Sequence, residues 1–103
     1  MAIAHPPPGE VIDVLSGESA TLVRAEHVEV FRMHLPCGKR TPEHRAAGAI
    51  TIQCLVGDIE LTVAGQARTL RAGQLVFLAD SQAHEVSALS DATLLISMWL
   101  HRK

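Results

Sequence analysis

Histidine is the residue type in this sequence that most readily binds a transition metal or exchanges a proton near neutral pH. The chain contains six histidines. His5, His27 and His101 lie near the termini or among charged residues, where a solvated imidazole is the ordinary outcome. The histidines left as candidates for a shared site are His34, His44 and His84.

The two cysteines offer a second kind of reactive side chain. Cys37 and Cys54 do not form a Cys-x-x-Cys pair, and two cysteines are too few for a disulfide framework. We therefore expect reduced thiols in a cytoplasmic protein, with a single bridge as the alternative. For Cys54 itself we expect a small buried hydrophobic residue.

Several functional classes have no signature in the sequence. The chain has 9 Lys+Arg against 11 Asp+Glu and no block of like charges, so we predict no nucleic-acid partner. The most apolar stretch, 92–100, is far shorter than the roughly 18 residues that cross a bilayer, so we predict no membrane span. No glycine-rich phosphate loop, Gly-x-Ser-x-Gly or His-Glu-x-x-His motif is present.

The elements that must position the histidines are predicted to be strands. A chain of 103 residues fits one domain. Short segments rich in Val, Ile, Leu and Thr alternate with turn residues every 8 to 12 positions, as in all-β sandwiches and barrels. The expected strands are 11–15, 19–23, 26–35, 50–56, 58–64, 67–71, 75–78, 84–89 and 92–100. We interpret residues 1–10 as an extended N-terminal leader and residues 11–103 as a single barrel domain, with a hairpin at Gly57-Asp58.

The last expected strand suggests a partner. Leu94, Ile96 and Met98 share one face by the period of two, while Leu95 and Trp99 lie on the other. A strand that is apolar on both faces in a small barrel needs a cover outside its own core. We therefore predict a homodimer.

Two glycine-led motifs give the chain a family resemblance. The first cupin motif is Gly-x5-His-x-His-x3–4-Glu-x6-Gly, and here Gly38 opens it, His44 matches the first histidine and Gly57 closes it. Ala46 and Ile50 stand where the second histidine and the glutamate would be. The second motif is Gly-x5-Pro-x-Gly-x2-His.

Residues 73–84 keep the ends and spacing of that second motif. Gly73 and His84 match, whereas Ala79 and Ser81 replace the inner proline and glycine. Over residues 38–88 the chain thus resembles the cupin superfamily of small β-barrels. The resemblance implies an all-β fold, a double-stranded β-helix or jelly-roll barrel of the RmlC-like cupin type.

The resemblance also implies that His44 and His84 share one pocket inside the barrel. Two imidazoles can hold Zn, Fe, Ni or Cu, but catalytic metals normally have three protein ligands, so a divalent transition metal would be weakly held. Glu43 and Glu85 neighbour the histidines and should point to the opposite faces of their strands. Cys54 lies about 13 Å along its strand from the usual carboxylate position. His34 is left as the candidate third ligand.

Three functional hypotheses are compatible with this site. The first is a small-molecule-binding protein whose pocket is lined by His44, His84, Ile50, Ile52, Phe77 and Met33. The second is a metal-dependent cupin enzyme of the dioxygenase or isomerase type. The third is a regulatory or structural module that acts through a partner chain.

A sugar epimerase that uses a His/Tyr acid–base pair is disfavoured, because the sequence contains no tyrosine. The sequence alone predicts neither a particular enzymatic activity nor a particular ligand. Because Ile50 replaces a carboxylate, we expect the imidazoles in the pocket to be neutral at pH 7.

Overall fold

A computed structural model describes residues 7–80 and 82–100, and this part of the chain contains eight β-strands. The predictions for His5, His101 and the Ser81 motif position lie outside the described residues. The strands are β1 (Ala20–Arg24), β2 (Val28–Leu35), β3 (Ile50–Val56), β4 (Asp58–Val63), β5 (Gln66–Arg71), β6 (Leu75–Leu78), β7 (His84–Ala88) and β8 (Ala92–Trp99).

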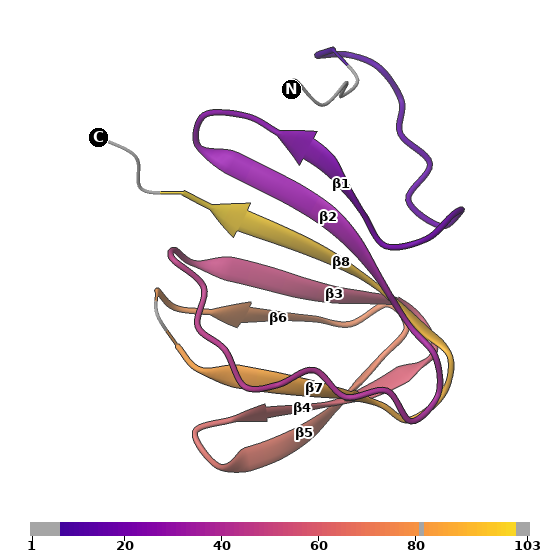
Figure 1. Ribbon diagram of the computed structural model, residues 1–103, viewed down its shortest axis with the longest axis vertical. Helices are drawn as coiled ribbons and strands as arrows, with labels where there is room; N and C mark the ends of the chain where they lie inside the picture. Colours follow the sequence, from indigo (N-terminus) through magenta and orange to yellow (C-terminus); the bar gives the residue numbers. More distant parts are fainter. Residues whose placement is uncertain (1–6, 81, 101–103) are drawn as a thin grey trace.

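The strands form two antiparallel sheets, as Figure 1 shows. One sheet has the order β1-β2-β8-β3-β6, and the other has the order β5-β4-β7. The long connection between β2 and β3 runs beside β7 and makes isolated bridges to it, so it extends the smaller sheet. The all-β prediction is confirmed.

The core lies between the two sheets and follows the period of two. In β3, Ile50, Ile52 and Cys54 are almost completely buried. They face the same side as their partners in β8, which are Met98, Ile96 and Leu94 in that order. Burial of these side chains, each contributing about 1.5 to 3 kcal/mol, holds the two layers together. The predicted burial of Cys54 is confirmed, and both cysteines are free thiols.

The predicted strand at 11–15 is wrong. Residues 7–19 contain no strand, and the Asp13 carboxylate accepts a hydrogen bond from the Leu15 amide at 3.0 Å. Such a local bond competes with strand pairing. The segment is instead held by Arg32 of β2, whose guanidinium donates to the Asp13 and Glu18 carbonyl oxygens at 3.1 and 2.8 Å.

The predicted hairpin at Gly57-Asp58 is also wrong. Gly57 has a positive φ of 81°, but β3 and β4 belong to different sheets, so the chain turns a corner there instead of pairing with itself. The tight hairpin joins β4 to β5. Its two loop residues, Ala64 and Gly65, have φ values of 52° and 77°, as a type I′ turn requires.

No helix in the described part of the chain is long and apolar enough to cross a membrane. The division between a leader ending at residue 10 and a barrel beginning at residue 11 stays a prediction. The observed strands begin only at Ala20.

Candidate functional site

The connection between β2 and β3 brings His44 to His84, the first residue of β7. The two residues form an antiparallel bridge in which each amide donates to the other's carbonyl oxygen at 3.0 Å. Their imidazole rings lie with centroids 4.3 Å apart and planes tilted by 59°. Two histidines separated by 40 positions therefore occupy one site.

Both rings are oriented by backbone carbonyl groups. The Nδ1 atom of His84 lies 3.1 Å from the Gln82 carbonyl oxygen, and the Nδ1 atom of His44 lies 3.4 Å from that of Pro42. A carbonyl oxygen only accepts hydrogen bonds, so these contacts assign the proton of a neutral ring to Nδ1. The lone pair is then on Nε2, available to a donor or a metal.

The charge of His84 is set by its surroundings. The side chain is buried, and burial lowers the pKa of this imidazole below its ordinary value of 6.5. The neighbouring His44 adds to the lowering of the pKa, whereas the bond to Gln82 opposes it. His84 is therefore neutral at pH 7, in agreement with the expectation from the sequence.

The two rings border a small cavity inside the barrel, with a volume of about 30 Å³. Met33, Ile50 and Ile52 line it, as the sequence predicted. Six further lining residues were not identified from the sequence: Phe31, Thr41, Ala46, Val86, Ile96 and Met98. The alternation of β2 and β8 could have indicated Phe31, Ile96 and Met98. A volume of this size has room for about one water molecule.

The two histidines supply the side-chain hydrogen-bonding groups that a ligand in the cavity could use. Besides the two histidines, Thr41 is the one described lining residue whose side chain can form hydrogen bonds through a hydroxyl or amide group. Its hydroxyl accepts a bond from the Val86 amide at 3.0 Å and lies 3.5 Å from the Val86 carbonyl oxygen, so it is already engaged. A ligand in this cavity would therefore meet hydrocarbon, two methionine thioethers and the two imidazoles.

Two of the predicted site residues lie elsewhere. Phe77 is 61% exposed on the outer face of the larger sheet, because the inward positions of β6 belong to its neighbours Val76 and Leu78. His34 lies on the outer face of β2, alternating with inward Met33 and Leu35, and its Nδ1 is 3.5 Å from the Thr93 hydroxyl. Neither residue lines the cavity.

The remaining residues do not complete a metal centre. Hydrocarbon side chains of Ala46 and Ile50 line the cavity, and Glu85 forms an ion pair with Arg40 at 3.3 Å on the outside. Among residues 7–80 and 82–100, no group of three or more His, Cys, Asp or Glu side chains is placed to hold a metal. The two imidazoles fit a two-ligand site and do not fit a catalytic centre with three protein ligands.

Comparison with known proteins agrees with this architecture. The sequence model of the cupin domain family matches residues 31–100. A conserved protein of unknown function from Streptococcus pyogenes is 18% identical, with both chains covered completely and a TM-score of 0.81. A cupin superfamily protein from Desulfitobacterium hafniense is 16% identical over 91% of this chain and 94% of its own, with a TM-score of 0.80.

An RmlC-like cupin with a double-stranded β-helix fold, from Methanocaldococcus jannaschii, is 17% identical. The match covers 93% of this chain and 94% of the other, with a TM-score of 0.77. At these identities the likeness shows the fold alone. No curated protein matches the chain.

Proposed function

Because the chain belongs to the cupin family, we propose that it is a small-molecule-binding protein in which His44 and His84 supply the polar contacts of an otherwise apolar cavity. The observation that carries the proposal is the pair of rings with centroids 4.3 Å apart, each oriented by a backbone carbonyl group. Side chains already fixed before binding lose little further freedom when a ligand arrives.

The chemistry of the site favours a small uncharged ligand with a hydroxyl or N–H group. Each Nε2 can accept one hydrogen bond, while Met33, Ile50 and Ile52 offer apolar contact. A charged group would meet no opposite charge among the lining residues. Because the cavity volume is about 30 Å³, a ligand larger than water has to enter at the exposed His44 or displace side chains.

A divalent transition metal, Zn, Fe, Ni or Cu, is the second candidate ligand. The Nδ1–carbonyl contacts support it, because metal-binding histidines usually donate their other ring N–H in this way. With two protein ligands, water would have to supply most of the coordination, so we expect weak binding. A metal-dependent dioxygenase or isomerase needs a third ligand that the described residues do not provide.

Calorimetric titration of untagged protein with Zn²⁺ and Ni²⁺ tests the metal proposal. We expect weak binding that is lost in both His44→Gln and His84→Gln, because each variant removes one of the two ligands. The matched control is His34→Gln on the outer face of β2, which should bind as the unchanged protein does. Equal loss in the control would contradict the assignment.

Nitrogen NMR of the imidazole side chains tests the small-molecule proposal. Small alcohols and amides should shift the Nε2 signals of His44 and His84 and leave that of His34 unchanged. The proposal fails if no neutral donor shifts either signal at millimolar concentration. Zinc bound without any response to neutral ligands would leave a metal-binding protein as the function.

A further inference from the structure

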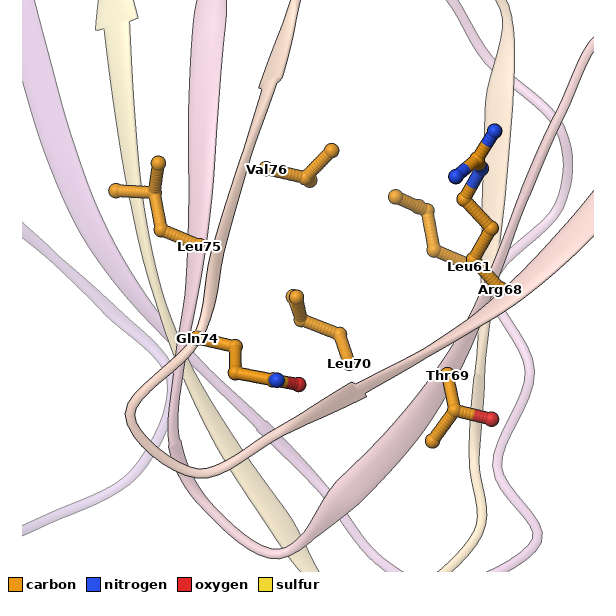
Figure 2. Close-up of a pocket in the computed structure, with 7 residues that line it drawn as sticks. All are labelled: Leu61, Arg68, Thr69, Leu70, Gln74, Leu75 and Val76. Carbon is orange, nitrogen blue, oxygen red and sulfur yellow. The ribbon is translucent and has the colours of Figure 1, made fainter.

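A second and larger cavity lies between the edge strands β5 and β6, where the two sheets separate. After β5 the chain turns at residues 72–74 and enters β6, which belongs to the other sheet. Figure 2 shows β5 and β6 diverging from this turn, with Leu70 and Gln74 near its apex. The space between them has a volume of about 450 Å³.

The inner wall of this space is apolar. Leu61, Leu70 and Val76 project into it from β4, β5 and β6 (Figure 2). A neighbouring cavity of about 250 Å³ shares Leu61, Arg68 and Val76 with it and continues toward Val63 and Leu78. We call the two together the seam groove. Its size falls in the range of sites that take organic molecules, unlike the cavity beside the histidines.

One charged side chain enters the seam groove. Arg68 is the only charged residue among the described residues that line either cavity. In β5 it shares the inward face with Leu70, two positions away, and Figure 2 shows its guanidinium beside Leu61. Its hydrogen-bond partner is the Gln66 side-chain oxygen, at a long 3.5 Å, and no carboxylate among the described residues forms an ion pair with it.

The other polar group at the apex is also a donor. The side-chain oxygen of Gln74 accepts a bond from the Arg71 amide at 2.8 Å, so the side chain is held in place with its NH₂ group left to donate. A guanidinium and an amide NH₂ beside a wall of leucine and valine match an acceptor-rich head group on an apolar body.

We propose that the seam groove binds a small amphipathic carboxylate, with its carboxylate on Arg68 and its apolar part against Leu61, Leu70 and Val76. A carboxylate matches the planar guanidinium with two parallel hydrogen bonds. Leu61 and Leu70 are only 2% and 8% exposed and Val76 is half-buried, so the apolar contact is shallow and the charge on Arg68 is the main attraction. An uncharged apolar molecule would leave the guanidinium without an acceptor. None of the proposed contact residues lines the cavity beside His44 and His84, so the proposal does not depend on the function of that site.

Backbone amide NMR with octanoate, kept below its micelle-forming concentration, tests this proposal. We expect shifts at Arg68, Leu70 and residues 74–76, with none at His44 and His84. Octanol, which has the same chain length without the charge, should bind at least about 10-fold more weakly, as for other hydrogen bonds to charged groups. Equal affinity for octanoate and octanol would overturn the proposal, as would the absence of binding at millimolar octanoate.

Matched variants locate the anion. Arg68→Gln should weaken octanoate binding about 10- to 100-fold, and Arg68→Lys should weaken it less. Arg71→Gln makes the same charge change in the same strand, but outside the lining of either cavity, and should have no effect. Equal weakening by the two glutamine variants would mean non-specific attraction and would overturn the proposal.

Sedimentation of the same variants separates a ligand site from a contact between copies of the chain. The strands β5 and β6 are sheet edges, and an inward charge on an edge strand can also prevent association. We expect Arg68→Gln to keep the mass of the unchanged protein. A shift in mass without a change in octanoate binding would assign Arg68 to edge protection and overturn the proposal.

Discussion

Among single residues, His84 links the stability of the fold to pH. Because burial lowers its pKa in the folded state, the unfolded chain takes up a proton at this position more readily as pH falls through about 6.5. Stability should therefore decrease from pH 7.5 to pH 5. In His84→Gln this part of the decrease should disappear, which urea unfolding at both pH values can measure. An unchanged pH dependence in the variant would contradict the prediction.

Gly57 is a second residue on which the fold depends. A Cβ at this corner between the sheets would overlap the Asp91 carbonyl oxygen, and φ is already positive. Gly57→Ala should cost about 3 to 5 kcal/mol in the free energy of unfolding, measured by urea titration. The matched control is Gly38→Ala, where φ is also positive but a Cβ meets nothing within 4 Å, and where about 1 to 2 kcal/mol is expected. Equal costs would refute the steric argument.

At the scale of elements, the β4–β5 hairpin carries a strained residue. Ala64 has a φ of 52° in a type I′ turn that glycine and asparagine occupy more easily. Ala64→Gly should stabilise the protein by up to about 1 kcal/mol, because removal of the Cβ relieves the left-handed conformation. Thermal unfolding would show this as a higher midpoint. Ala67→Gly, within β5, is the control and should lower it. A lower midpoint for Ala64→Gly would contradict the prediction.

The strands were predictable where the period of two is clear. In β3, and in β8 from Leu94 to Ser97, buried residues alternate along the sequence, so the inward faces could be identified from composition and spacing. The wrong hairpin prediction lies where the pairing depends on distant residues. Gly57-Asp58 carries a hairpin signal, yet Ser90 bonds the Asp58 amide at 3.0 Å and the chain passes into the other sheet. No local pattern distinguishes a corner from a hairpin.

The residues of the candidate site were also only partly predictable from the sequence. His44 and His84 were paired through a motif resemblance, and Met33, Ile50 and Ile52, which were named as pocket residues, do line the cavity. Phe77 and His34, which were also named from the sequence, do not line the cavity, because each alternates with inward neighbours in its own strand. The seam groove left no sequence signal, since Arg68 resembles any exposed arginine of an edge strand. Its position becomes evident only once β5 and β6 diverge into separate sheets.

At the scale of the whole molecule, the homodimer predicted from the sequence stays a proposal. The outer face of the larger sheet exposes Leu75, Phe77 and Trp99, at 55%, 61% and 46% of their surfaces. Apolar side chains gathered on one sheet face are typical of a protein interface. These three residues, from β6 and β8, favour a second copy of the chain as the partner that would bury this face.

Sedimentation velocity at micromolar concentration checks the dimer. We expect a dimer for the unchanged protein and a monomer for Trp99→Lys, because the lysine charge would be buried in the interface. Leu89→Lys is the control, since Leu89 is 50% exposed but lies outside the strands of this face, and the variant should remain dimeric. A monomeric unchanged protein would refute the proposal.

The reciprocal amide bonds between His44 and His84 have a practical consequence. These two hydrogen bonds join the β2–β3 connection to β7 beside the imidazoles, where a ligand would bind. Any occupant that steadies these bonds should slow the replacement of the two amide protons by solvent deuterium. The exchange rate of these two amides would therefore report whether the site is occupied, and it could be used to screen compounds before any activity is known.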